Sequence, residues 1–351
     1  MSKYWSKLTA RLEPYIPGEQ LNDKKYIKLN TNENPYPPSP KVIEAIKAAT
    51  DSSLKLYPDP AAADLKSTLA KHYGLKSSQV FVGNGSDEVI AFAFMAFFNT
   101  DEEVLFPDVT YSFYPVYANI FNIDYRLVTL QEDFGVPVEE FFNAEGGVII
   151  PNPNAPTARA ISSKDIERIL VNNREKVVII DEAYVDFGAE SVVGLIEKYE
   201  NLLVVQTLSK SRSLAGLRVG WALGQEHLIE GLTRVKDSIN SYTLDRLALI
   251  GAAAAIEDVE YFEETREKIM ATRERITMNL ENLGFNIIPS KANFIFMSHE
   301  NTPAEHIFKR LKEEGVLVRY FKKPGIDNYL RVSIGTDAEM DAMIEKLVEI
   351  I

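Results

Sequence analysis

Short, unbroken apolar runs alternate with longer amphipathic stretches along the chain up to Asp258. Runs such as Val148–Ile150, Val177–Ile180 and Leu202–Val205 are typical of strands that are buried on both faces of a sheet. Because helical patterns separate these runs, the chain is predicted to form a mainly parallel sheet with helices on both faces. The strands are expected near residues 80–82, 103–106, 125–130, 148–150, 177–180, 202–205 and 219–223, and helices are expected to begin near 39, 61 and 86.

After Asp258 the pattern changes. A long, charged amphipathic helix is predicted over 259–283, and the strand and helix patterns that follow it are typical of an α+β domain. These strands are expected at 285–288, 294–297, 316–320 and 330–334, with helices around 303–314 and from 337 onward. We therefore expect a large domain over residues 46–258 and a small C-terminal domain over 259–351.

The N-terminal segment, residues 1–45, is expected to pack with the small domain. Its first forty or so residues are rich in proline and asparagine and include Thr31–Pro38, TNENPYPP. Because proline removes a backbone donor and fixes φ, this stretch is not expected to form a regular helix or a central strand. It is predicted to wrap over the surface instead.

The composition narrows the class of protein. The chain has 351 residues, of which 46% are hydrophobic and 25% charged, as in a globular enzyme with more than one core. Its net charge of -13 argues against nucleic-acid binding and against attachment to an anionic membrane, since both kinds of binding depend on clustered Lys and Arg. The chain has no cysteine, no visible signal peptide and no apolar run long enough to span a membrane, so a cytoplasmic location is expected.

The segment Thr207–Arg218 places a lysine at the end of a predicted buried strand. Lys210 stands between serines, and Arg218 follows in the same segment. A buried amine needs an anion or a covalent partner, and desolvation lowers its pKa, so that the neutral amine can serve as a base or form a Schiff base. A ligand with an aldehyde and a phosphate, such as pyridoxal phosphate, would account for all these groups. A solvated lysine in a polar loop is the alternative that this segment alone leaves open.

Two further strand ends carry candidate groups. The glycines at 83 and 85 permit a tight turn, and Ser86 and Asp87 are expected to supply an N-cap and backbone donors for a phosphate. Asp181 follows a buried run, where open α/β sheets bind ligands. A run of this kind also suits a P-loop ATPase, but the chain has no Gly-Lys dipeptide and therefore no such loop. Asp181 is expected to face a buried cation, such as a protonated pyridine nitrogen.

Tyr111 and Asn154 follow two other predicted strands. Tyr111 could lie on an aromatic ring and Asn154 could donate to a ring hydroxyl, although such residues are more often core aromatics and turn residues. The four histidines are His72, His227, His299 and His306. They lack the spacing of metal ligands, so they are expected at the surface and no metal site is expected.

In their joint order, these motifs resemble the fold type I pyridoxal-phosphate aminotransferases of class I and II. The motifs that carry the resemblance are Gly85-Ser86-Asp87, Tyr111, Asn154-x-Pro156-Thr157, Asp181 with Tyr184, Thr207-x-Ser209-Lys210 and Arg218. The segments that are most similar to the histidinol-phosphate branch of this family are 31–35, 57–59, 181–184 and 330–336. The resemblance covers essentially the whole chain, and it implies a mainly parallel seven-stranded sheet plus a smaller α+β domain.

The resemblance implies a role for each candidate that would touch the cofactor. Lys210 would bind pyridoxal phosphate covalently, be released by the incoming amine and then move a proton between the substrate and the cofactor. Asp181 would pair with the pyridinium, Tyr184 and Asn154 would bond the ring hydroxyl, and Tyr111 would stack on the ring. The residues that would hold the phosphate are Thr207, Ser209, Arg218 and the helix start at Ser86 and Asp87.

The resemblance also implies a homodimer with shared sites and a substrate pocket. Tyr57 would reach the phosphate in the neighbouring subunit. Arg331 would bind the acidic group of the substrate, with Arg319, Tyr15 and Asn32 nearby, since guanidinium groups suit both carboxylate and phosphate.

The chain departs from the family pattern at one turn. Ala155 stands where asparagine is usual, so the ring-hydroxyl contact is assigned to Asn154, and Ala158 replaces a glycine. This alanine suggests that no positive φ is needed at 158.

The expected reaction is transfer of the amino group of L-histidinol phosphate to 2-oxoglutarate, which gives imidazole-acetol phosphate and L-glutamate in histidine biosynthesis. An aromatic amino acid aminotransferase and a threonine-phosphate decarboxylase on the same scaffold are the alternatives. A non-catalytic domain of this fold is disfavoured, because Lys210 and Asp181 are intact and the N-terminal segment is too short for a helix-turn-helix domain.

Overall fold

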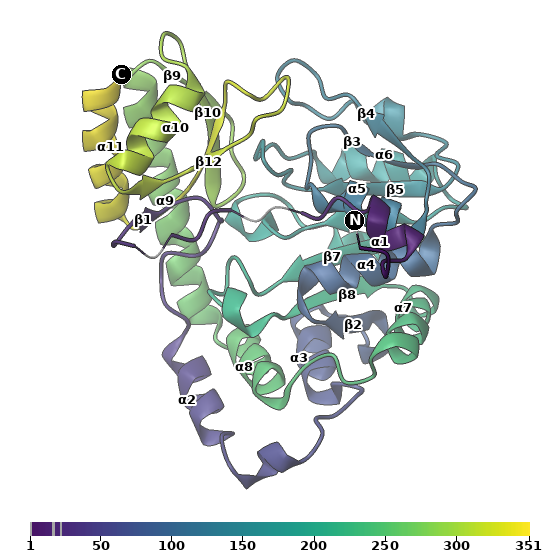
Figure 1. Ribbon diagram of the computed structural model, residues 1–351. Helices are drawn as coiled ribbons and strands as arrows, with labels where there is room; N and C mark the ends of the chain where they lie inside the picture. Colours follow the sequence, from purple (N-terminus) through teal and green to yellow (C-terminus); the bar gives the residue numbers. More distant parts are fainter. Residues whose placement is uncertain (1, 16–17, 22) are drawn as a thin grey trace.

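A seven-stranded sheet forms the centre of the larger part of the molecule (Figure 1). The structure, a computed structural model, describes residues 2–15, 18–21 and 23–351. The strand order is β2-β8-β7-β6-β5-β3-β4. The strands are β2 (Val80–Gly83), β3 (Val104–Pro107), β4 (Tyr125–Val128), β5 (Gly147–Pro151), β6 (Val178–Asp181), β7 (Leu202–Thr207) and β8 (Gly220–Gly224). β8 is antiparallel to both of its neighbours and the other pairs are parallel, so the predicted sheet is confirmed.

Helices cover both faces of this sheet because neighbouring residues of each buried strand point to opposite sides. In β6, Val178 and Ile180 pack in one core while Ile179 packs in the other. The first core is closed by α2 (Pro40–Ala48), α3 (Ala63–Tyr73), α6 (Ser163–Val171) and α8 (Arg246–Glu257). The second is closed by α4 (Gly85–Phe97), α5 (Phe113–Phe121) and α7 (Glu226–Ile239). The sequence pattern had not placed α5, α6 or α7.

The C-terminal part forms a second, smaller core. Its antiparallel sheet has the order β12-β13-β10-β9. These strands are β9 (Phe285–Ile288), β10 (Phe294–His299), β12 (Arg319–Tyr320) and β13 (Leu330–Ser333), and the helices are α9 (Val259–Asn282), α10 (Ala304–Glu313) and α11 (Asp337–Ile350). In Figure 1 these elements form a body at the end of α9 that is distinct from the large sheet.

Two predictions for the chain path are corrected. The single strand expected over 316–320 is divided into β11 (Val316–Leu317) and β12, because β11 pairs with β1 (Ile27–Lys28) whereas β12 pairs with β13. In the N-terminal segment, a short helix forms before the prolines, α1 (Lys7–Arg11), whose N-cap is Ser6. A cap and local hydrogen bonds are sufficient for a helix of this length before the prolines begin.

The N-terminal segment contacts both parts of the molecule. Arg11 donates to the carbonyl of Asn119 in α5 (3.3 Å), and the ring of Tyr15 lies 4.4 Å from that of Phe113. Further along, β1 joins the smaller part by its pairing with β11. The remaining regular elements are short 3₁₀ helices: η1 (Ser52–Lys55), η2 (Ser77–Gln79), η3 (Val138–Phe141), η4 (Val185–Phe187), η5 (Val193–Leu195) and η6 (Ala215–Leu217).

Candidate active site

The loops that carry the candidate residues meet at one edge of the large sheet. β3, β5, β6 and β7 are parallel, so their carboxyl ends lie at the same edge. Gly220 at the start of β8 pairs with both Thr207 and Gly83, which brings the ends of β7 and β2 to this edge as well. Ligands of open α/β sheets bind at this kind of edge.

A cavity at this edge is lined by side chains from both parts of the molecule. The predicted residues that line it are Tyr15, Asn32, Tyr111, Tyr184, Lys210, Arg319 and Arg331. Asn30, Thr110 and Phe321 also line it, and sequence reasoning did not single them out. The large sheet therefore supplies the lysine of the cavity and the small sheet supplies its arginines.

Lys210 lies in the loop after β7 and is half-buried. Its Nζ is 5.6 Å from the centre of the Tyr184 ring. Its backbone is held from the N-terminal segment, because Asn34 Nδ2 donates to the carbonyls of Lys210 and Ser211, each at 3.1 Å. Asn34 thus fixes the main chain that carries the amine into the cavity.

Asp181 ends β6 and is buried, with 5% of its surface exposed. One carboxylate oxygen accepts from the Tyr114 hydroxyl (2.8 Å) and the other accepts from the Ala183 N–H (3.1 Å). Burial raises the pKa of Asp181 to about 6, and the Tyr114 hydrogen bond opposes this rise. Sequence reasoning missed Tyr114, although it lies three positions beyond Tyr111, one helical turn away.

A second group of polar side chains surrounds the start of α4. The hydroxyl oxygens of Thr207 and Ser209 lie 2.9 Å apart, and both residues are buried. Arg218 Nη2 is 3.2 Å from Asp87 Oδ2, and the Tyr111 hydroxyl donates to Asp87 Oδ1 at 2.7 Å. A cation, two hydroxyls and the first turn of a helix therefore meet at one place.

The predicted cap of α4 was wrong. The N-cap is Asn84, and the helix begins at Gly85, so Ser86 and Asp87 lie in the first turn. The Asp87 carboxylate accepts from Tyr111 and Arg218 instead of capping the helix. The free backbone N–H groups of a first turn remain suited to an anion.

Two glycines allow this close approach of segments. A Cβ on Gly220 would lie 2.3 Å from the Ser86 nitrogen, and a Cβ on Gly85 would lie 2.5 Å from Arg218 Nη2. Gly85 also has a φ of +79°, a backbone angle that residues with a side chain rarely adopt. The space between β8 and α4 is therefore available to main chain alone.

Asn154 and Ala158 form a buried turn after β5. Asn154 Nδ2 donates to the Val109 carbonyl and to the Thr157 hydroxyl, both at 2.9 Å. Its Oδ1 is buried without a hydrogen-bond partner among the residues that the structure describes. Ala158 has a φ of +64°, so the expectation of no positive φ there was wrong. The turn closes because the Ala158 N–H donates to the Asn154 carbonyl at 2.8 Å, which holds the alanine in this conformation.

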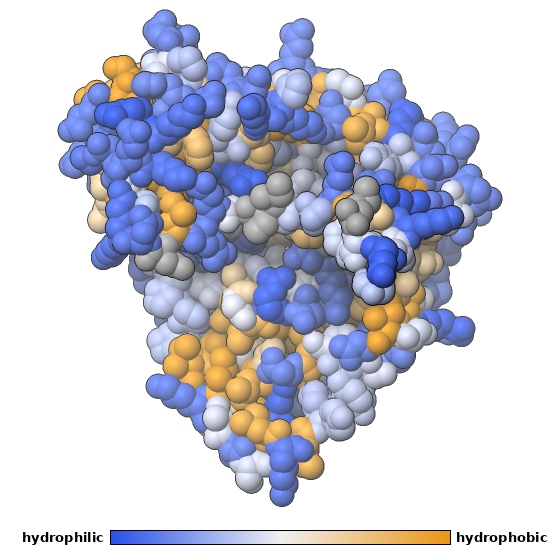
Figure 2. Space-filling model, in the orientation of Figure 1, coloured by the Kyte–Doolittle hydropathy of each residue, from blue (hydrophilic) through white to orange (hydrophobic). Residues whose placement is uncertain are grey.

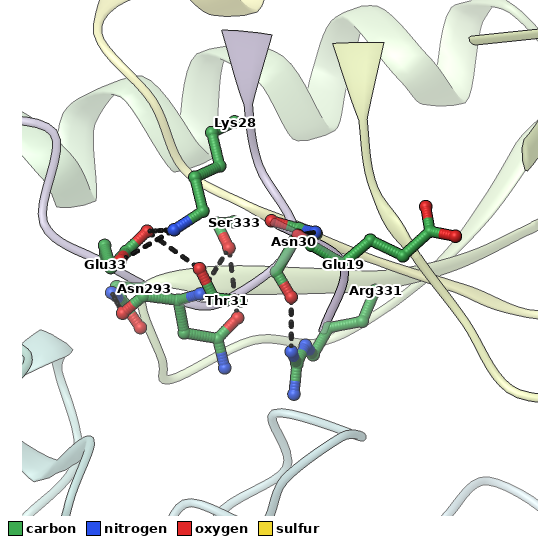
Figure 3. A network of polar contacts seen from close by, with 9 residues as sticks. Glu19, Lys28, Asn30, Thr31, Glu33, Asn293, Arg331 and Ser333 are labelled. Carbon is green, nitrogen blue, oxygen red and sulfur yellow. Dashed lines mark hydrogen bonds and ion pairs between the residues drawn. The ribbon is translucent and has the colours of Figure 1, made fainter. Parts of the chain in front are cut away.

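Arg331 on β13 points toward the N-terminal segment (Figure 3). Its Nη2 donates to the Asn30 carbonyl at 2.9 Å, and its guanidinium carbon lies 5.4 Å from the ring centre of Phe294 and 5.7 Å from that of Phe321. Burial lowers the pKa of Arg331 from its ordinary value. Its Nε has no hydrogen-bond partner within the described ranges. A buried guanidinium with an unused donor is suited to an anionic ligand.

Asn32 connects the small sheet with Tyr184. Its N–H donates to the Ser333 hydroxyl (2.8 Å), and its Nδ2 donates to the Tyr184 hydroxyl (3.0 Å). Figure 3 shows the adjoining contacts, in which Lys28 and Thr31 both bond Glu33. This stretch of chain thus holds the lining of the cavity in place.

Tyr57 lies apart from the other candidates. Its side chain is 78% exposed, and its ring stacks on that of Tyr242 with 4.7 Å between centres. Arg246 donates to its carbonyl at 3.3 Å. The structure does not bring Tyr57 to the cavity of its own chain.

One of the four histidines is buried. His299 is 8% exposed, so its expected surface position was wrong; its ring accepts from the N–H of Thr302 (3.0 Å) and lies 3.0 Å from the Leu283 carbonyl. The other three histidines are exposed as expected. Among the described residues, no cluster of His, Asp or Glu could hold a metal ion. Within the same ranges, no helix has the length and apolar character needed to cross a bilayer.

Comparisons with known proteins agree on one family. The family model "Aminotransferase class I and II" matches residues 24–347. A histidinol-phosphate aminotransferase of Clostridium acetobutylicum is 62% identical over 351 residues, covering 100% of both chains. One of Clostridium beijerinckii is 56% identical over 347 residues, covering 99% of this chain and 97% of the relative.

A solved structure shows the same fold. It is the histidinol-phosphate aminotransferase of Sinorhizobium meliloti in complex with pyridoxal-5'-phosphate, which is 24% identical with a TM-score of 0.90. The alignment covers 100% of this chain and 98% of that chain. With a matching family model over nearly its whole length and full-length relatives of this identity, the chain belongs to the class I and II aminotransferases.

Proposed function

We propose that this chain is a pyridoxal-phosphate-dependent aminotransferase that moves the amino group of L-histidinol phosphate to 2-oxoglutarate, in the pathway of histidine biosynthesis. The observation that carries the proposal is the 62% identity over the full chain to a relative named histidinol-phosphate aminotransferase. The cavity supports it, because one amine and two arginines face the same space. A phosphate in one half-reaction and a dicarboxylate in the other both need such cations.

The residues around the sheet edge fit pyridoxal phosphate. The buried Oδ1 of Asn154 has no partner within the described residues, and a ring hydroxyl would supply one. Ser86 and Asp87 lie in the first turn of α4, and Arg218 lies 3.2 Å from Asp87, so the free N–H groups of this turn and a guanidinium could both contact a phosphate. Asp181 is a buried acid to which no basic side chain of the described residues is hydrogen-bonded, and a pyridinium would supply the cation.

Each candidate then has a role in binding. Asp181 would pair with the ring nitrogen, and Tyr184 and Asn154 would contact the ring hydroxyl. Tyr111 would lie against the ring while its hydroxyl stays on Asp87. The groups that would hold the phosphate are Arg218, Thr207, Ser209 and the backbone N–H groups of Ser86 and Asp87.

The chemistry depends on two protein groups that act on protons. When bound, pyridoxal phosphate supplies an electron sink for the carbanion that forms at the substrate carbon. The Lys210 amine would hold the cofactor, and after its release it would move the proton at the substrate carbon. The Asp181 carboxylate would keep the ring nitrogen protonated. Tyr184, held by Asn32, would keep the ring hydroxyl oriented.

The substrate anion would bind at the small sheet. Arg331 offers an unused Nε in a buried position, and Arg319 lines the same cavity. Tyr15 and Asn32 would close the cavity from the N-terminal segment. A guanidinium accepts a phosphate or a carboxylate through the same donors, so one pocket would serve both substrates.

The proposed assembly is a homodimer. Figure 2 shows an apolar area on the surface near α2, η1 and α8, and the exposed side chains there include Ile43, Leu54 and Leu56. Tyr57 projects beside this area. Burying such a surface against a second copy would bring Tyr57 toward the partner's phosphate site. A cytoplasmic location is proposed from the biosynthetic role.

The test is a comparison of catalytic efficiency for L-histidinol phosphate and for phenylalanine, with 2-oxoglutarate as acceptor and glutamate as the measured product. We expect a clear preference for histidinol phosphate, and Lys210→Ala should fold but lose turnover. A preference for phenylalanine would overturn the substrate assignment. Release of carbon dioxide from threonine phosphate would favour the decarboxylase, and a protein that stays colourless with added pyridoxal phosphate would favour a non-catalytic domain.

A further inference from the structure

Two tyrosines near the start of α5 each donate to a different acid at the candidate site. The Tyr111 hydroxyl donates to Asp87 at 2.7 Å, and the Tyr114 hydroxyl donates to Asp181 at 2.8 Å. The two rings meet edge to face, with 5.7 Å between centres and an interplanar angle of 83°. One helix start therefore reaches both acids, although only Tyr111 lines the cavity.

Tyr114 is the more constrained of the two residues. Its side chain is fully buried, and its ring packs against Phe106 with 5.9 Å between centres. A buried phenol needs an acceptor, and the Tyr114 hydroxyl donates to the Asp181 carboxylate. Burial raises the pKa of Tyr114 well above its ordinary value, so its hydroxyl remains a donor at all working pH values.

The groups that face Asp181 come from several elements. Tyr114 comes from α5, the Ala183 N–H from the loop after β6, Asp87 from α4 and Lys210 from the loop after β7. Burial and the negative charge of Asp87 both favour a protonated Asp181, whereas the two donors and Lys210 favour the carboxylate. Among the described residues, Tyr114 is the one side-chain donor that is hydrogen-bonded to this acid.

We propose that Tyr114 is a positioning residue for Asp181: its hydroxyl orients the carboxylate and keeps it ionised toward the ring nitrogen of the cofactor. This inference depends on the proposed function, since it assumes that Asp181 faces a pyridinium. Without the donor, the proton of the ion pair would move toward the carboxyl, and the ring would withdraw electrons less strongly.

The test is Tyr114→Phe, which removes one oxygen atom, with Tyr125→Phe as its matched control. Tyr125 in β4 is partly buried and stacks on Phe106, the ring against which Tyr114 also packs, so the control removes the same atom from the same core. In Tyr114→Phe we expect kcat to fall about tenfold, with KM for both substrates changed less than about twofold. We also expect a shift in the pH dependence of the visible absorbance of the bound cofactor and a several-fold weaker cofactor Kd. Tyr125→Phe should leave all four quantities unchanged.

A double-mutant cycle separates action through Asp181 from a general effect on packing. In an Asp181→Asn background, Tyr114→Phe should change neither the cofactor spectrum nor its Kd. Additive effects in the two backgrounds would overturn the proposal, as would a Tyr114→Phe enzyme with wild-type spectrum and kcat. A wild-type protein that binds no pyridoxal phosphate would instead overturn the proposed function.

A graded series covers the case in which Tyr114→Phe does not fold. Site-specific replacement of Tyr114 by fluorinated tyrosines keeps the ring and the hydroxyl but makes the phenol more acidic in steps. The pH midpoint of the cofactor absorbance should then move steadily with phenol acidity. A midpoint that stays constant across the series would contradict the role of the hydroxyl.

Discussion

At the residue scale, Glu182 is a buried acid that the proposed chemistry does not use. It is 2% exposed, and it accepts hydrogen bonds from the Val192 N–H, the Ser191 hydroxyl and Gln206 Nε2, each at 2.7 Å. Burial outweighs these donors and raises the pKa of Glu182 from 4.5 to about 7. Glu182 is therefore expected to be neutral below about pH 7 in the folded protein.

This shift predicts a pH dependence of stability with a defined sign. Between pH 4.5 and about 7 the folded protein holds a proton that the unfolded chain has released, so the contribution of Glu182 to stability falls as pH rises. Across this window the free energy of unfolding of wild type should fall by about 3 kcal/mol relative to Glu182→Gln. Urea unfolding of both proteins at pH 5 and pH 8 measures the difference. The exposed Glu200→Gln is the control, and a constant difference between wild type and Glu182→Gln would contradict the buried titration.

Charged residues that directly follow buried apolar strands were predictable from the sequence. Lys210 and Asp181 are charged groups at the ends of apolar strands, and the structure places both at the same sheet edge. Tyr114 was not predictable, because a tyrosine within an aromatic run resembles any core residue until its hydroxyl is placed. The φ of Ala158 was predicted wrongly for a related reason. Its positive value is imposed by hydrogen bonds of the turn, and an alanine side chain gives no sign of it.

At the scale of elements, the contact of β8 with the start of α4 predicts that a side chain at position 220 will disturb the fold. A Cβ on Gly220 would lie 2.3 Å from the Ser86 nitrogen and 2.5 Å from the Gly85 carbonyl carbon, and neither backbone atom can move freely. Gly220→Ala should therefore displace the first turn of α4, where the phosphate is proposed to bind. We expect a loss of stability of about 2 kcal/mol or more, together with weaker retention of the cofactor.

Gly216→Ala provides the matched control for this contact. Gly216 lies in the same loop region, in η6, and a Cβ there would have no heavy atom within 4 Å. Thermal unfolding and dialysis against cofactor-free buffer compare the two variants. Equal behaviour of Gly220→Ala and Gly216→Ala would show that the approach of β8 to α4 is not needed for binding.

The sequence pattern predicted most elements but missed α6 and α7, although both are strongly amphipathic helices. Apart from the half-exposed β4, the strands of the large sheet are buried and largely apolar runs, and α4 and α9 place apolar residues at helical spacing, so these elements were predicted. α5 has the aromatic sequence FYPVYANIF, with a proline inside its first turn, which does not resemble an amphipathic helix. The break at Val318 depends on which strand pairs with β1 and which with β13, and pairing is a property of the assembled sheet.

At the scale of the whole molecule, Tyr57 lies outside the cavity of its own chain, and the proposed homodimer would bring it to the site of the other subunit. Tyr57 is 78% exposed and stacks on Tyr242, outside the cavity that contains Lys210. If the proposed homodimer forms, each site combines Lys210 and Asp181 of one subunit with Tyr57 of the other. The arrangement can be tested by placing one substitution in each of the two subunits of a dimer.

Mixed dimers of Lys210→Ala and Tyr57→Ala subunits should regain activity. In such a dimer one site carries both lesions, and the other site combines an intact Lys210 with an intact Tyr57. Random mixing makes half of the dimers mixed, so about a quarter of all sites should be intact when turnover is measured at limiting cofactor. Mixing Lys210→Ala with Asp181→Asn is the control, since these two residues serve the same site and no intact site can form. If Tyr57 acted within its own subunit, or if the protein were a monomer, mixing Lys210→Ala with Tyr57→Ala would give no more activity than the two proteins measured separately.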